Sequence, residues 1–257
     1  MTTTRPLPAL PDPHRVGGTN WAKRTGARLR ARDRAWMAPV AIATQVRNTA
    51  QRQRPRLRTP TIDESALTAP DSHLVREAEA AALEQPRALL AHAYRTAIFA
   101  RALALVDRVA VDDELLYVCA LLHDVGLIEA VAGQDFTLRS AHAAVGCARR
   151  AGEPEFVADH LADALIAHTT VGVTPERDGA LASYTQYGAM VDLTGLRSRH
   201  LPASLIKTAV RDHPRDHFKT ELLRMFHAEA AAVPGGRFAF LKHVGFPLAV
   251  RLAPFET

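Results

Sequence analysis

Apolar residues recur every three or four positions along most of the chain from about residue 72 onward, which is the spacing of one face of an α-helix. No stretch alternates apolar and polar residues for long enough to predict a β-strand. The pattern predicts helices over residues 72–84, 86–107, 112–122, 139–151, 154–168, 180–193, 202–211 and 214–231. The expected fold class is therefore all-α, a helical bundle.

The two ends of the chain carry weaker patterns. Residues 1–70 combine a Pro- and Thr-rich start with a helical stretch that Pro39 is expected to interrupt. We expect this part to be a basic extension, partly disordered or helical, and residues 71–257 to be one helical domain. The Gly and Pro residues after position 234 predict a mostly irregular C-terminal tail. This tail is expected to pack on the domain through Phe238, Phe240, Leu241 and Phe246.

The apolar runs are too short to cross a bilayer. The longest, such as Leu115 to Leu122, end in charge well before the roughly 18 residues that a crossing needs. The N-terminus has Pro residues where a secretory signal would have an apolar segment, so a cytoplasmic location is the expectation. The two cysteines, Cys119 and Cys147, each lie in an apolar helical stretch and are interpreted as core residues.

The net charge of +5 comes largely from one segment. Between Lys23 and Arg58 the sequence has many Lys and Arg residues against the single acid Asp33. Such a tract can attract phosphate backbones, acidic partners or membrane surfaces, but regularly interleaved aromatic residues for stacking on bases are missing. A solvated basic extension is therefore favoured over nucleic-acid binding, and no membrane partner is expected.

The segment LLHDVG places His123 and Asp124 side by side at the end of a strongly apolar helix. A buried carboxylate beside a buried imidazole needs a partner, and a divalent cation would supply one. His92 and Asp192 also stand among apolar neighbours, where each alone is as well explained as a core histidine or a satisfied acid. Together the four residues supply nitrogen and oxygen ligands suited to zinc, iron or manganese.

The order of a His, then His-Asp, then a distant Asp resembles the HD superfamily of metal-dependent hydrolases. The resemblance runs from about Leu89 to about Leu241, and is closest to the cyanamide hydratase-like branch. The matching segments are CALLHDVG (residues 119–126), FTLRSAHAA (136–144), ALIAHTTVG (164–172), GAMVDLTG (188–195) and AVRDHPRDHFKTELLRMF (209–226).

The resemblance implies an HD domain whose metal is held by His92, His123, Asp124 and Asp192. A metal-bound hydroxide would then attack a small polar substrate with a nitrile-like or amide-like group. Asp124 and His168 are the implied catalytic residues, with His168 binding substrate or moving a proton. The cofactor is expected to be zinc or iron, with manganese as a further candidate.

Two departures keep alternatives open. Thr169 and Thr170 follow His168 where the family usually has Gln-Asp, which puts the polar contacts to a small substrate in question. His142 completes the ligand order of dinuclear family members, so His142 and His168 are candidates for a second metal site. With two metals the protein would be a di-iron oxygenase; otherwise His142 is a structural residue at a helix start. A phosphohydrolase of nucleotides or phosphoesters, with the same helices and metal, is a separate alternative.

The remaining candidates concern the pocket and the partners. Asp163, Thr169, Tyr184 and Tyr187 are candidates for contacts around the ligands or in the pocket. A phosphohydrolase needs cations in the pocket, and between residues 89 and 192 the candidates, such as Arg95 and Arg139, are few. The expected partner is a small-molecule substrate, and a homo-oligomer and a non-enzymatic regulatory domain remain open.

Overall fold

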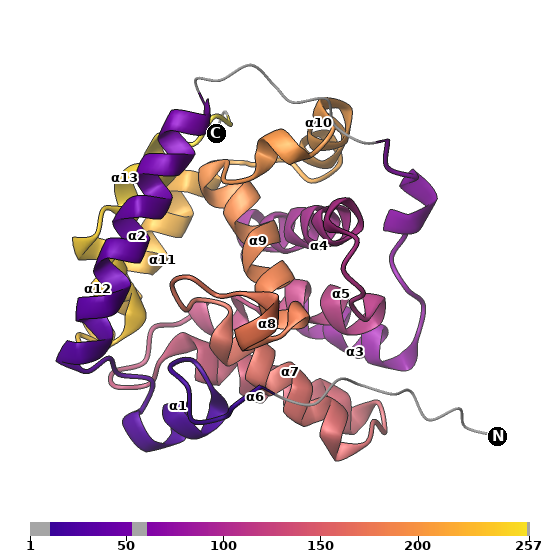
Figure 1. Cartoon of the computed structure of the whole chain (residues 1–257). Coiled ribbons are helices and arrows are strands. Elements are labelled where there is room, and N and C mark those ends of the chain that lie inside the picture. The colour runs from indigo at the N-terminus through magenta and orange to yellow at the C-terminus, as the bar shows by residue number, and fades with distance from the viewer. Residues whose placement is uncertain (1–10, 53–60, 256–257) are drawn as a thin grey trace.

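The computed structural model describes residues 11–52 and 61–255 (Figure 1). The described residues form thirteen α-helices and three short 3-10 helices. They contain no β-strand, only an isolated bridge between Val131 and Gln134. The predicted all-α fold is confirmed.

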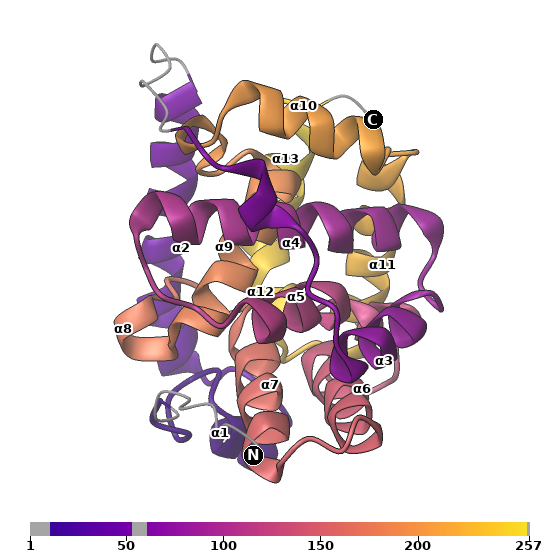
Figure 2. The same ribbon diagram turned by 90° about the vertical axis from the view of Figure 1, so that its right-hand side faces the viewer.

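Two helices cross at the centre of the bundle, α4 (Arg87–Asp107) and α9 (Ala180–Thr194) (Figures 1 and 2). Their close approach depends on Gly188 of α9, because a Cβ atom there would lie 2.4 Å from the backbone oxygen of Thr96. By composition α4 is long and apolar enough to span a membrane, but 67% of its apolar window is buried, as in a core helix. The crossing fixes how residues of α4 face those of α9.

Three further helices surround this crossing: α5 (Asp113–Leu122) packs on α4 and α9, α7 (Glu155–Ala167) packs on α9 and α5, and α6 (Phe136–Arg150) packs on α5 and α7. α3 (His73–Ala82) packs on α5 and α6. Side-chain caps define where α5 and α6 begin: Asp112 accepts from the Leu115 amide and Asp135 accepts from the Thr137 amide. Both cysteines are buried and unpaired in α5 and α6, as expected.

The described part of the N-terminal segment packs on the bundle. α1 (Thr19–Thr25) contacts α7 and contributes Trp21 to the main core. α2 (Ala31–Arg52) lies along one side of the molecule in front of α12 and α13 (Figure 1). Arg15 anchors the segment that precedes α1, because it binds the carboxylates of Asp163 and Asp178 on the domain. Residues 1–10 and 53–60 of the expected extension lie outside the described residues, and the boundary at residue 70 stays a prediction.

The expected interruption at Pro39 is wrong. The break comes earlier, at Gly26, which ends α1 in the left-handed conformation with φ 61°. Pro39 lies inside α2 and is exposed, and Ala35, whose carbonyl loses its helical partner because of the proline, is exposed as well. That carbonyl can be hydrated, so the helix continues through the proline.

The C-terminal segment is helical where an irregular tail was expected. α12 (Arg237–His243) and α13 (Phe246–Arg251) follow α11 (Phe218–Ala232), and Phe240 and Phe246 are buried as predicted. The helices are short because Gly236 and Gly245 stand at their starts. The remaining elements are α8 (Pro175–Asp178), α10 (Ala203–Asp212), and the 3-10 helices Glu64–Leu67, Val125–Leu127 and Ser198–His200.

Candidate metal centre

Three predicted ligands meet at the centre of the bundle. His92 comes from the first half of α4, and His123 and Asp124 from the end of α5. Each side chain is buried, and one donor atom of each lies within 4.8 Å of the donor atoms of the other two. Because α4 and α5 pack against each other, residues 92 and 123 lie in one cluster although they are far apart in the sequence.

The hydrogen bonds of the imidazoles fix which nitrogen faces the cluster. His92, His123 and His168 each donate from Nδ1, since the acceptor is a carboxylate or a carbonyl oxygen. The acceptors are Asp192 Oδ2 at 2.7 Å for His92, Ala120 O at 2.8 Å for His123 and Leu165 O at 2.6 Å for His168. In its neutral form each ring therefore has Nε2 free of a proton, which is the form that binds metals.

These Nε2 atoms point toward Asp124. The Nε2 atoms of His92 and His123 lie 3.3 Å apart, and Asp124 Oδ2 is 3.8 Å from the first and 3.2 Å from the second. His168 Nε2 lies 4.0 Å from Asp124 Oδ1. Two unprotonated nitrogens facing each other need a positive charge between them, so this donor set fits a divalent cation with nitrogen and oxygen ligands.

The end of α5 is held by α6. Ser140 Oγ donates to the His123 carbonyl at 2.9 Å and accepts from the Gly126 amide at 2.9 Å. Gly126 lies so close to α6 that an added Cβ atom would be 2.1 Å from the Phe136 oxygen. This explains the glycine two residues after Asp124, because any side chain there would push the His123–Asp124 pair away from α6.

Burial and mutual charge set the protonation of the cluster. Burial would raise the pKa of Asp124, but the adjacent His123 outweighs it and lowers the pKa to about 2. Burial, together with His123, lowers the pKa of His168 to about 3, and burial also lowers the pKa of His92. For His123 burial opposes protonation, yet Asp124 outweighs it and raises the pKa. Near neutral pH the cluster has an ionised carboxylate and at least two neutral imidazoles ready to bind a cation.

Asp192 lies behind His92. Its carboxylate binds His92 Nδ1, takes two hydrogen bonds from Arg95 at 2.9 and 2.8 Å, and is in contact with Arg215 Nη1. These positive partners overcome burial and depress the pKa of Asp192. The carboxylate thus orients the His92 ring and neutralises two buried guanidinium groups. Its assignment as a direct metal ligand stays a prediction.

The arginine pair was not assigned this role from the sequence. Arg95 is three residues after His92 on the same helical face, and this spacing was the available signal. Arg215 lies in the segment 209–226 that resembles the family, yet its contact with Asp192 spans 23 residues of the chain. Both side chains are buried, and Arg95 also donates to the carbonyls of His213 and Pro214.

The second metal site between His142 and His168 is not assembled. His168 faces the cluster from the end of α7, but His142 is exposed on α6. Ser140 and Ala144, two residues to either side, are buried against the bundle. Because residues two apart on a helix point in very different directions, His142 is turned away from the site. The structural interpretation of His142 therefore replaces the two-metal one.

Among the residues expected around the pocket, only Thr169 lines it. Asp163 is buried, but it accepts hydrogen bonds from Arg15 and from the amide and hydroxyl of Thr19, so it anchors α1 and orients no imidazole. The hydroxyl of Tyr184 donates to Asp107 and that of Tyr187 donates to the Val173 carbonyl. The two tyrosines therefore have packing roles, not contacts in the pocket.

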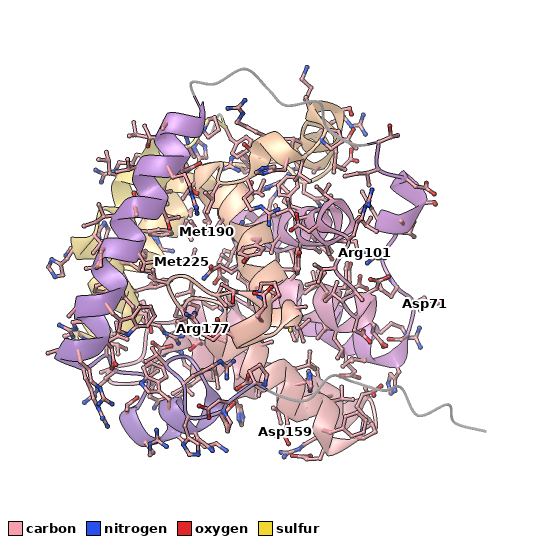
Figure 3. All side chains as sticks on the ribbon, viewed as in Figure 1. Asp71, Arg101, Asp159, Arg177, Met190 and Met225 are labelled. Carbon is pink, nitrogen blue, oxygen red and sulfur yellow. The ribbon has the colours of Figure 1, made fainter. Side chains whose placement is uncertain are left out.

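A cavity of about 130 Å³ opens onto His123, Asp124 and His168. Most of its wall is apolar, and α2 contributes Ala41, Thr44 and Gln45 to it. Met190 of α9 lines the cavity, and it lies with Met225 of α11 on the side of the bundle that α2 covers (Figure 3). The other apolar lining residues include Leu193, Leu222, Phe226, Phe238, Leu241 and Phe246. The lining contains no Lys or Arg side chain among the described residues.

The family model for the HD domain matches residues 89–229, which is more than half of the 257-residue chain. The match contains all four predicted ligands, the two arginines and His168, while α1, α2, α12 and α13 lie outside it. No curated protein matches the chain.

Proposed function

Because the chain belongs to the HD domain family, whose members are generally metal-dependent hydrolases, we propose that it adds water to the carbon of a small, uncharged nitrile-like or amide-like substrate. The observation that carries the proposal is the mostly apolar cavity of about 130 Å³ that opens onto His123, Asp124 and His168. Such a cavity accommodates a compact molecule whose single polar group reaches the metal centre.

The chemistry divides between the metal and the chain. When bound, a divalent cation supplies Lewis-acid activation of water near neutral pH. The Nε2 atoms of His92 and His123 and the carboxylate of Asp124 would hold that cation. His168 Nε2 lies 4.0 Å from Asp124 Oδ1, and its position at the cavity suits it to take the proton of the attacking water. Zinc and iron suit this donor set, with manganese as a further candidate.

The size of the cavity limits the substrate. A cavity of about 150 Å³ holds a benzene molecule, so a space of about 130 Å³ accepts a body of roughly six heavy atoms or fewer. The uncharged side chains of Thr44, Gln45, Thr169 and Gln186 are the polar groups of the wall outside the metal centre. Hydration of a nitrile to an amide, or hydrolysis of an amide to an acid and ammonia, suits a neutral substrate of this size.

Phosphoester hydrolysis is less well supported. A transferred phosphoryl group needs cations around its oxygens. Arg95 is bound to Asp192, and Arg139 is bound to the Gly126 carbonyl and to Glu229, so neither faces the cavity. A di-iron oxygenase would require His142 as a ligand, and its exposed position argues against that chemistry.

Elemental analysis joined to product detection tests the proposal. Protein prepared without chelators is expected to hold about one zinc or iron ion per chain and to release amide, urea or ammonia from a panel of butyronitrile, butyramide and cyanamide. The His123→Asn variant should lose metal and activity together, while His168→Gln should lose activity by about a hundredfold or more and keep its metal. His142→Gln, at an exposed position, is the matched control and should change neither.

Two outcomes would overturn this assignment. Release of phosphate from phosphoesters with no activity on the neutral panel would favour the phosphohydrolase. Two metal ions per chain, one of them lost in His142→Gln, would restore the dinuclear site.

A further inference from the structure

The helix that walls the cavity is apolar on its outer side as well. On α2 the buried residues Asp33, Met37, Ala41 and Asn48 follow one another at helical spacing and form the inner stripe. On the opposite side Ile42 is 53% exposed and Val46 is 64% exposed. A helix at the surface of a soluble domain normally turns polar residues outward, so this outer side requires another explanation.

The apolar surface continues onto α13, where Leu248 and Leu252 are 58% and 59% exposed. The two helices are neighbours, because Gln45 donates to the Val244 carbonyl at 2.9 Å just before α13 and residues of both helices line one small cavity. Of the nine exposed large apolar side chains in the described residues, five lie on these two helices and Leu252 directly follows α13. Trp36 and Val40 lie on the flank of α2 that faces Arg177 and Gly172. The other four are Ile42, Val46, Leu248 and Leu252, and we name the surface that they form the α2–α13 face.

The exposed charged side chains on α2, α12 and α13 in the described residues have one sign. The exposed Lys and Arg side chains of α2, α12 and α13 in the described residues are Arg32, Arg34, Arg47, Lys242 and Arg251. The one acidic residue of these helices is Asp33, which is buried and accepts a hydrogen bond from the Arg30 amide. No exposed carboxylate from these three helices therefore offsets the positive charge in the described residues.

We propose that the α2–α13 face docks on an anionic lipid surface, which departs from the expectation that no membrane is a partner. Exposed branched aliphatic side chains with arginine and lysine on the same helices form the combination that lies at the boundary between headgroups and acyl chains. Each basic residue near an anionic surface strengthens the attraction, and apolar side chains enter where the headgroups end. A second copy of the chain fits less well, because a symmetric contact would bring the arginines of both copies together.

Vesicle binding of the full, metal-loaded chain tests the proposal. We expect co-sedimentation with vesicles of phosphatidylcholine mixed with phosphatidylglycerol, little with phosphatidylcholine alone, and weaker binding as salt is added. Trp36, on the flank of α2 next to this face, is 38% exposed while Trp21 is 4% exposed, so a shift of the emission to shorter wavelength on binding would report that α2 approaches the lipid.

Variants distinguish lipid binding by this face from non-specific binding by exposed apolar side chains elsewhere. Ile42→Gln with Val46→Gln should weaken binding to the mixed vesicles at least about tenfold, since two apolar side chains no longer leave water. Arg47→Glu should weaken it about fivefold or more. The matched control is Leu83→Gln with Phe156→Gln, which removes two exposed apolar side chains from other surfaces and should leave binding unchanged.

Three results would overturn the proposal. The first is a wild-type chain that binds neither kind of vesicle, and the second is equal loss of binding in the control. The third is a wild-type dimer in light scattering that becomes a monomer with Ile42→Gln and Val46→Gln, because the occupant of the face would then be a second copy.

Discussion

The two ends of the cavity differ in how firmly their side chains are held. At the inner end His92, His123 and His168 each have one nitrogen tied to a fixed acceptor, and Asp192 has partners on both carboxylate oxygens. At the outer end the wall is α2, which reaches the bundle mainly through a narrow stripe of buried residues and two side-chain amides, those of Gln45 and Asn48.

This contrast separates two tasks of the site. A metal centre needs donors held in place before the metal and the substrate arrive, and a buried, mutually bonded cluster supplies that. An apolar wall binds substrate by removing apolar surface from water, and this interaction has no preferred direction. The wall therefore tolerates changes of substrate shape at a small cost in binding free energy. We therefore expect changes at the inner end to affect stability and metal binding, and changes at the outer end to affect access to the cavity.

The largest effect is expected at Asp192. Asp192→Ala would leave Arg95 and Arg215 buried without a counter-charge, at a cost of about 3–5 kcal/mol in the free energy of unfolding, measured by urea denaturation. Asp212→Ala is the control, because it removes a carboxylate from an exposed pair with Arg211 and should leave the denaturation midpoint unchanged. Equal denaturation midpoints for the two variants would contradict the expectation that Asp192 stabilises the inner end of the cavity.

A smaller effect is expected where α4 and α9 cross. Gly188→Ala would place a methyl group 2.4 Å from the Thr96 oxygen, separate the helices and cost about 1–3 kcal/mol, with weaker metal binding because His92 moves relative to α5. Gly146→Ala on α6 should instead stabilise the fold by up to about 1 kcal/mol, since its new methyl group meets only the flexible end of Arg150. Thermal unfolding and metal titration of both variants would show whether the signs are opposite, and equal signs would refute the packing argument.

The smallest effect is expected at the outer wall. Gln45→Ala removes the hydrogen bond to the Val244 carbonyl and should cost about 1 kcal/mol or less overall. Hydrogen exchange should rise in α2 and stay the same in α4, because only the attachment of α2 is weakened. Thr49→Ala, which removes a bond within α2 at an exposed position, serves as the control. Faster exchange in α4 as well would mean that the two regions unfold together.

The local pattern of apolar and polar residues was sufficient to predict the helices of the domain and to find His123 and Asp124 of the site. His123 and Asp124 were recognisable because two charged groups at the end of an apolar helix need a common partner. The helix ends were predicted within a few residues wherever a cap such as Asp112 was present. Pro39 misled the prediction, since its effect depends on whether the carbonyl four residues earlier is buried or hydrated.

The features that the sequence did not predict depend on contacts between residues far apart in the chain. Asp163 was expected near the metal, but its partner Arg15 lies 148 residues away, and Tyr184 binds Asp107 at a separation of 77. Helical periodicity places a residue on a face and does not name the opposing side chain. The contribution of α2 to the cavity was missed as well. Periodicity does not show what α2 faces, and the helix lies outside the region of family resemblance.

The position of α2 matters for anyone who shortens this protein. A fragment cut at the limits of the HD match, residues 89–229, would keep every donor to the metal and discard the helix that closes the cavity. Water would then reach the apolar side chains of α9 and α11 directly. Such a fragment would have its metal ligands next to an open, solvent-filled cavity. A lower selectivity for substrate in that fragment would then be wrongly attributed to the metal centre and not to the missing wall.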